Sequence, residues 1–373
     1  MPSAASLFFD AVLTYDGSSY TDVTLEAQSP AGTAFTILAD TNDYLYLGHS
    51  ERFDMAVFDL DTAGSYGALT WQYYNGAWTT FIPASGRYQL DYDDNEGGPY
   101  DFTKDGVEEF PTNLLTGWTT TGTIGSVGSK YWVRVSSAAS VAGAATVKRL
   151  QMRPVNAYCT SADVFNLLQM SQILGGTDFT SSTTPTKAIV EDYIQASQSH
   201  IDYRTRKSWR PNYIAAEYHD FNLNGFKPMH PDMYRLLSLR VWSGSVWDTK
   251  EISRKQDFFF VPDTGMIHFS RYFILPARFA SYNAPIWRWG GGEFTTPIKI
   301  EYLAGRDFHS DQREAGIVFD CARKLAAVDI IRSADFGNIT VSGADRVMAE
   351  NRASGWATDV DERLESLRAF EVF

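Results

Sequence analysis

The chain has 373 residues, 44% hydrophobic and 21% charged, and its 32 Lys and Arg against 45 Asp and Glu give a formal net charge of -13. This length suits about two domains. The sequence contains neither a membrane-length apolar run nor a basic signal-peptide start, so we expect a soluble protein made in the cytoplasm.

The acidic charge is concentrated in the first part of the chain. Residues 1–155 carry 8 Lys and Arg against 18 Asp and Glu, a net charge of -10, whereas residues 156–373 carry 24 against 27, a net charge of -3. An acidic surface argues against tight binding to duplex DNA, because phosphate contacts need clustered cations.

The first part of the chain has the pattern of short strands. Runs such as YLYLG, MAVFDL and LTWQYYNGAW are separated by Gly, Asp, Asn and Ser, and no helical period persists. We therefore predict an antiparallel β-sandwich over residues 1–155, with surface loops at 91–109 and 117–129.

Two features of this part invite a functional interpretation. Asp91, Asp93 and Asn95 alternate as calcium ligands do, but Gly97 comes one place late and no bidentate glutamate follows, which favours a solvated acidic loop. Four aromatic residues could form stacking platforms for sugars, although core packing around a hairpin at YYNGAW is the favoured interpretation. These are Trp71, Tyr73, Tyr74 and Trp78.

The pattern changes to helices near residues 153–157, where we place the domain boundary. Thr160 or Ser161 begins one helix, and Thr184 and Pro185 begin a second, with the proline in its first turn. Residues 213–303 return to strands, a long helix follows from Ser310, and a last helix runs from about 359 to 370. Residues 156–373 are therefore predicted to be α+β, a helical bundle with a β-insertion.

The sequence shows no catalytic, cofactor-binding or metal-binding constellation, and we predict that the protein is not an enzyme. GHSER lacks the second glycine of a nucleophile elbow, and the six histidines never fall at the i, i+4 spacing of a metal pair. Glu108 and Glu109 are neighbours on an extended segment and point to opposite faces, so they cannot flank one glycosidic bond. Cys159 and Cys321 are expected to be buried, with no disulfide.

The second part of the chain resembles the head-to-tail adaptor (connector or head-completion) proteins of tailed bacteriophages. The resemblance lies in YCTSADV at 158–164, in IKIEYLAG at 298–305 before the helix VFDCARKLAAVDII, and in DERLESLRAF at 361–370. It also lies in Ile189, Tyr193, Ile194, Ala196, Ser197, Ile201, Asp202 and Trp209 of the second helix. The first part is similar to β-domains of phage virion proteins, through YLYLG, FD, FDL and WQYYNGAW.

This resemblance implies a virion protein of the phage neck. It would form a ring, commonly dodecameric, that docks on the portal protein and meets the tail or stopper protein. Genomic DNA would pass through the channel without sequence-specific binding, and no membrane or cofactor would be involved. The alternative is a carbohydrate-binding or accessory module of a tail receptor-binding structure.

Four cations follow the second helix in an otherwise acidic chain, namely Arg204, Arg206, Lys207 and Arg210. We expect this basic end, with Trp209 as an anchor, to contact a neighbouring subunit or the portal. Contact with channel DNA and simple compensation of the helix dipole remain alternatives.

The C-terminal residues Leu364, Leu367, Phe370 and Phe373 place apolar side chains three residues apart. Because chain ends fray unless they are docked, we predict that this segment engages the portal; packing onto the chain's own bundle is the alternative.

Overall fold

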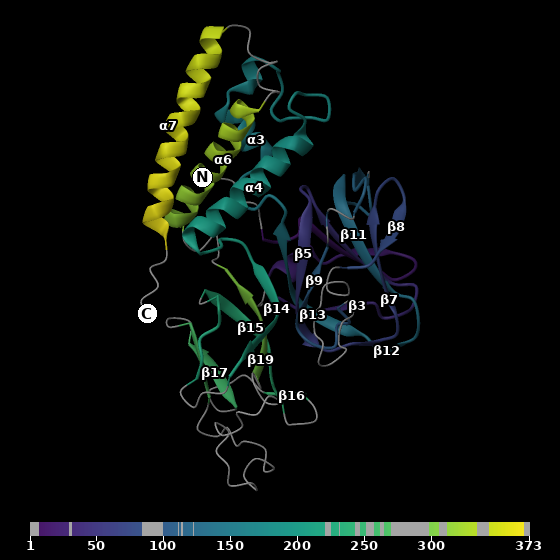
Figure 1. Ribbon diagram of the computed structural model, residues 1–373. Helices are drawn as coiled ribbons and strands as arrows, with labels where there is room; N and C mark the ends of the chain where they lie inside the picture. Colours follow the sequence, from purple (N-terminus) through teal and green to yellow (C-terminus); the bar gives the residue numbers. More distant parts are fainter. Residues whose placement is uncertain are drawn as a thin grey trace. The chain divides into compact units, whose positions relative to one another are not determined.

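The computed structural model describes most of the chain (Figure 1). The described residues are 7–29, 32–83, 100–110, 112, 115–121, 123–220, 225–230, 232–242, 247–250, 257–261, 265–269, 298–305, 312–333 and 343–368. They fall into two compact units, the first made of Met1–Tyr88, Gly98–Arg210 and Phe308–Phe373, and the second of Gln89–Gly97 and Pro211–Asp307. The predicted boundary near residue 155 stays a prediction.

The first unit contains two large antiparallel sheets. Strands β1 (Ala11–Tyr15), β2 (Tyr20–Asp22), β4 (Tyr44–His49), β7 (Leu69–Tyr74), β8 (Trp78–Phe81) and β11 (Lys130–Ser137) form one sheet, in the order β2-β1-β4-β11-β7-β8, with β10 (Thr120–Thr121) beside β11. Strands β3 (Phe35–Ile37), β5 (Phe53–Thr62), β9 (Gly106–Glu109) and β13 (Ala145–Pro154) form the other, in the order β3-β13-β5-β9. The same unit contains a short helix, α1 (Thr24–Gln28), and a two-stranded sheet of β6 (Ser65–Tyr66) and β12 (Val141–Gly143).

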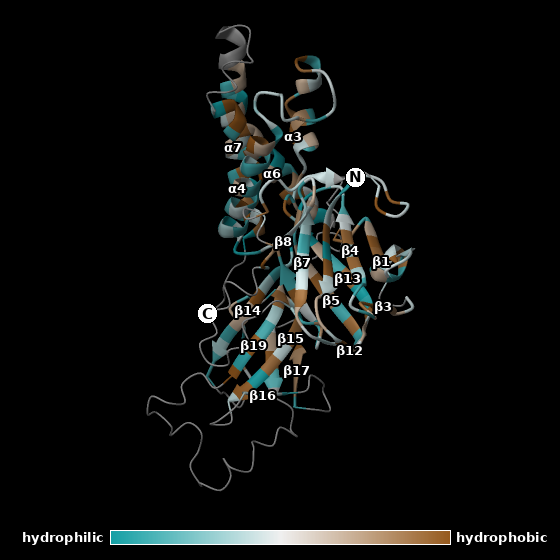
Figure 2. Ribbon diagram, turned by 90° about the vertical axis from the view of Figure 1, so that its right-hand side faces the viewer, coloured by the Kyte–Doolittle hydropathy of each residue, from teal (hydrophilic) through white to brown (hydrophobic). Residues whose placement is uncertain are grey.

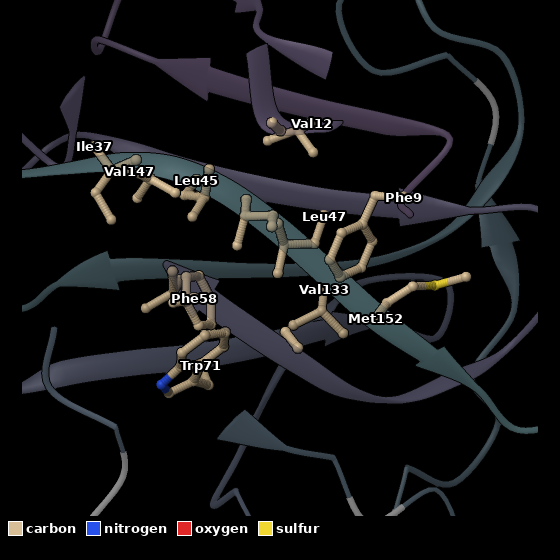
Figure 3. Packing of buried hydrophobic residues seen from close by; sticks show 14 of the residues in the cluster. Phe9, Val12, Ile37, Leu45, Leu47, Phe58, Trp71, Val133, Val147 and Met152 are labelled. Carbon is tan, nitrogen blue, oxygen red and sulfur yellow. The ribbon is translucent and has the colours of Figure 1, made fainter. Parts of the chain in front are cut away.

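The two sheets share one apolar core (Figure 3). Leu45, Leu47 and Val133 come from the larger sheet, and Phe58 and Met152 come from the smaller one. Buried and partly exposed residues largely alternate along β13 (Figure 2), because successive side chains of a strand point to opposite faces, whereas β5 buries the four consecutive residues 55–58. Two antiparallel sheets around one core are what the alternation in residues 1–155 predicts.

The two predicted surface loops are only partly correct. Residues 106–109 form strand β9, which pairs with β5, and Glu108 is fully buried where its carboxylate accepts the Tyr100 N–H at 2.6 Å. Within the second predicted loop, Trp118 is 3% exposed and its indole N–H donates to the Trp132 carbonyl. The burial of these residues was not predicted, because the segments around them are acidic or rich in glycine.

The first unit also holds the helices α3 (Ser161–Leu167), α4 (Lys187–Thr205), α6 (Gln312–Arg332) and α7 (Gly343–Leu367), with a 3-10 turn, η1 (Met170–Gln172), after α3. Helix α6 packs against the other three, around a core that includes Cys159 and Cys321. Neither cysteine is in a disulfide, as predicted. No helix in the described ranges is long and apolar enough to cross a bilayer.

The starts of helices α3, α4 and α7 can be compared with those predicted from capping residues and proline. Thr160, one of the two predicted caps, is the N-cap of α3; its hydroxyl accepts the Asp163 N–H and the Asp163 carboxylate accepts the Thr160 N–H, which forms a capping box. Helix α4 begins at Lys187, so Pro185 precedes the helix rather than occupying its first turn. Helix α7 begins at Gly343, well before the predicted start at Asp359.

The second unit is a separate β-structure. Strands β14 (Asn212–His219), β15 (Met233–Trp242), β16 (Trp247–Thr249) and β19 (Ile298–Ala304) form an antiparallel sheet in the order β14-β19-β15-β16. Strands β17 (Phe258–Val261) and β18 (Met266–Phe269) form a hairpin. Antiparallel sheets therefore dominate the described chain, with four main helices, in agreement with a β-rich multidomain fold.

Candidate interface at the end of helix α4

Helix α4 ends where the basic segment begins. Arg206 takes a left-handed backbone conformation with φ of 54°, which stops the helix. The hydroxyl of Thr205 is buried and donates to the Ile201 carbonyl four residues earlier at 2.8 Å, a back-bond within the last turn of the helix. The chain then turns so that Trp209 enters the core with 1% of its surface exposed.

Arg204, Lys207 and Arg210 each have an acidic partner in their own chain. Arg204 lies 3.4 Å from Asp361 on α7, and Lys207 lies 4.0 Å from Glu314 on α6. The Arg204 pair is largely exposed, at 44% and 61%, so it contributes little stability, about 0–1 kcal/mol. The basic end therefore joins α4 to α6 and α7.

The third pair belongs to a buried network. Arg210 lies 3.3 Å from Asp202, and the Tyr158 hydroxyl donates to the same carboxylate while it accepts the Trp209 N–H at 2.8 Å. Burial raises the pKa of Asp202 to about 6, against the lowering effect of Arg210 and of the Tyr158 hydrogen bond. Burial and the Asp202 charge likewise raise the pKa of Tyr158 well above its usual value.

Gln198 supports this network and was missed in the sequence. Its side chain is fully buried, accepts the Tyr158 N–H at 2.9 Å and donates to the Val155 carbonyl at 3.0 Å. The signal that could have found it is a glutamine between Ile194 and Ile201 on the apolar face of α4, because a buried amide needs partners.

The exposed part of the helix end borders a pocket of about 420 Å³. It is lined by Asp202, Tyr203, Arg204, Arg206, Glu365 and Arg368, from the ends of α4 and α7. Tyr203 is 83% exposed, and Arg368 lies 3.3 Å from Glu365. The structure thus separates the predicted interface residues into buried ones, such as Trp209, and an exposed rim around this pocket.

The C-terminal residues divide in a similar way. Leu364 and Leu367 are 1% and 5% exposed and belong to the bundle core together with Val360. These two side chains therefore pack on their own bundle, the alternative that the sequence left open. Phe370 and Phe373 lie outside the described residues, and portal contact through them stays a prediction.

The other predicted sites have mixed outcomes. Trp71 and Tyr73 are buried in the sandwich core, whereas Tyr74 and Trp78 are partly exposed around the Asn75–Gly76 turn, where Gly76 has φ of 105°. The acidic segment with Asp91, Asp93 and Asn95 lies outside the described residues. Elsewhere, among the residues that the structure describes, no cluster of His, Cys, Asp or Glu is arranged to hold a metal ion.

Comparison with known proteins gives few matches. No protein-family model and no curated protein matches the chain. Among solved structures, a chain from the neck of an empty gene transfer agent particle, computed with C6 symmetry, is 18% identical over 58% of this chain and 93% of that one, with a TM-score of 0.33. A chain from the virion of a native gene transfer agent particle is 16% identical over 58% and 94%, with a TM-score of 0.30. Similarity at this level does not establish a function.

Proposed function

We propose that the protein is a structural component of a phage neck, in which residues 156–373 are a head-to-tail adaptor. The observation that carries the proposal is that residues through which the sequence resembles the adaptors pack in one core. Tyr158, Val164, Ile194, Ile201 and Trp209 are all at most 1% exposed and belong to the same cluster. The helices around them occur in the family's order, with the strand IKIEYLAG before the long helix α6.

In this role the protein forms a ring, dodecameric by resemblance, that docks on the portal protein and meets the tail or stopper protein. The ring surrounds the channel through which genomic DNA leaves, and it is part of the virion. Residues 1–155 supply a β-domain that decorates the neck.

The exposed rim around the α4–α7 pocket supplies the subunit or portal contact. Tyr203, Arg204, Arg206 and Arg368 combine an exposed aromatic ring with guanidinium groups, the residue types that dominate interface energetics. Acidic side chains of a neighbouring copy would set the register against these cations. Channel DNA is a poorer partner, because the chain is acidic overall and a gripping lining would hinder passage.

Charge reversal on this rim tests the proposal. The full chain and an Arg204→Glu, Arg206→Glu double variant are mixed with the portal protein of the same genome, and complexes are measured by analytical ultracentrifugation. We expect a complex with the unaltered chain and a loss of at least about tenfold in affinity with the variant. The matched control is Arg332→Glu, at the exposed end of α6. Equal binding by all three chains would contradict the rim assignment, and no binding by the unaltered chain would contradict the adaptor role.

A further inference from the structure

The outer face of the seven-stranded sheet, turned away from the sandwich core, carries a continuous group of aromatic residues. The strand register places Tyr20 beside Tyr15 and Tyr15 beside Tyr44 in one row. The next row has Tyr46 beside Arg134 and Arg134 beside Gln72, and a third row has Tyr74 beside Trp78. We name this set the aromatic face; its residues are Tyr15, Tyr20, Tyr44, Tyr46, Gln72, Tyr74, Trp78 and Arg134.

The rings of the aromatic face touch one another around a central cation. The Arg134 guanidinium lies 4.1 Å from the centre of the Trp78 ring and 4.4 Å from that of Tyr44. Tyr46 contacts both Tyr44 and Trp78, with ring centres 5.9 and 5.5 Å away, and Tyr20 contacts Tyr46 at 5.6 Å. Such contacts are typical of cation–π and edge-to-face packing.

This arrangement is rigid. Arg134 donates from Nε to the Gln72 side-chain oxygen at 2.8 Å and from Nη1 to the Tyr46 hydroxyl at 3.2 Å. Beneath the rings, Leu13 and Trp132 form a small buried cluster on the same side of the sheet. A partner therefore meets side chains whose conformations are already fixed, which lowers the entropy lost on binding.

The rings of the aromatic face are at least partly exposed except for Tyr46, which is 3% exposed, and the sandwich core does not need the exposed ones. Tyr20 is 43% exposed, and Tyr15, Tyr44, Tyr74 and Trp78 are partly exposed. The sandwich core is built from the other face of the same strands, for example from Leu45 and Val133. Ile124 and Val127 pack against the small cluster of Leu13 and Trp132 on this side of the sheet, and the main sandwich core does not use the partly exposed rings.

The charge of residues 1–155 and the side-chain chemistry of the aromatic face indicate what kind of partner this face can bind. The surrounding residues 1–155 carry a net charge of -10, which disfavours nucleic acid and acidic polymers. The cation at the centre of the face is already stacked on two rings and hydrogen-bonded to Gln72 and Tyr46. An uncharged partner with both apolar faces and hydroxyl groups complements rings that have an apolar body and a polar edge.

We propose that the aromatic face binds an oligosaccharide, with Trp78 and Tyr44 as stacking platforms and with Gln72 and the edge of Arg134 meeting the sugar hydroxyls. This site does not depend on the neck assignment of residues 156–373. It differs from the platform expected in the sequence, because Trp71 and Tyr73 are in the core and Tyr44 and Arg134 take their places.

Ligand-observed NMR with the full chain tests the proposal, using a panel of neutral hexose, N-acetylhexosamine and uronate hexasaccharides. We expect saturable binding of a neutral or N-acetylated member, weakened about tenfold by Trp78→Ala. Trp356→Ala is the matched control, because Trp356 is also partly exposed and stacked on an arginine, Arg352, at 4.9 Å. It should leave binding unchanged.

A second variant, Tyr20→Ala, removes the most exposed ring and keeps the test decisive if Trp78→Ala fails to fold; it should also weaken binding. Absence of binding by every saccharide, or equal binding by both variants and the unaltered chain, would overturn the proposal. Loss of a virion-protein contact in Trp78→Ala without any saccharide signal would assign the face to a protein partner and also overturn it.

Discussion

The largely buried carboxylate of Asp202, whose side chain is 20% exposed, makes the stability of the first unit depend on pH in an unusual direction. Its pKa is raised by burial from 3.8 to about 6, so the folded chain binds a proton more tightly than the unfolded chain. Stability from this group is therefore complete below about pH 4 and is lost as the pH rises through about 6. Asp202→Asn removes the titration while keeping an oxygen that can accept the Tyr158 hydroxyl hydrogen bond.

The size of this effect follows from the shift in pKa. A difference of about two pKa units corresponds to about 3 kcal/mol between the protonated and ionised forms. About 2 kcal/mol of this falls between pH 4.5 and pH 7.5, because the unfolded carboxyl is mostly ionised throughout that interval. Asp202 is mostly protonated at pH 4.5 and ionised at pH 7.5, so its charge pair with Arg210 forms only at the higher pH, and the pKa of about 6 already includes the effect of that pair.

Urea unfolding followed by tryptophan fluorescence measures this, at pH 4.5 and at pH 7.5. The free energy of unfolding of Asp202→Asn relative to the unaltered chain should rise by about 2 kcal/mol from the lower to the higher pH. Asp361→Asn is the control, because Asp361 also pairs with an arginine near the end of α4 but is 61% exposed; its relative stability should change by less than about 0.5 kcal/mol. A pH-independent difference for Asp202→Asn would refute the reasoning.

Three further substitutions test the packing. Gly48→Ala should destabilise the sandwich by about 1–3 kcal/mol in urea unfolding, because the new methyl group would lie 2.5 Å from the buried Trp132 ring; no loss would show that the ring can move. Thr160→Ala should lower stability by about 1 kcal/mol through loss of the capping box, and Thr160→Ser should restore it. Leu364→Ala should lower the unfolding free energy by about 2–5 kcal/mol, since the side chain is 1% exposed; an unchanged value together with lost portal binding would instead indicate a docking role.

Features fixed by neighbouring residues could be predicted from the sequence. The helix cap at Thr160 and the hairpin turn at Gly76 depend on contacts within a few positions, and both are present. Helix α7 was predicted too short because Ala353, which is 2% exposed, adds little to an apolar pattern although it packs in the core. Strand β15 lies within residues 213–303, which were predicted to form strands, although register shifts at Met233/Arg235 and Leu236/Ser238 break the two-residue alternation.

The candidate interface was predictable only as a collection of residue types. The pair Arg204–Asp361 joins residues separated by 157 positions, and no local pattern places them together. Tyr158 and Asp202 also belong to separate elements, so no local pattern in the sequence predicts the hydrogen bond between them. The sequence therefore identified the basic end, and the structure was needed to separate its buried anchors from its exposed rim.

Electron cryomicroscopy of the full chain mixed with the portal protein of the same genome tests the central claim most directly. The account predicts a ring of this protein on the portal, with the exposed rim of Arg204 and Arg206 at a contact between subunits or with the portal. A chain lacking residues 369–373 keeps the buried Leu364 and Leu367 and so tests the C-terminal contact without removing core residues. A portal that stays bare in the presence of the full chain would contradict the adaptor role.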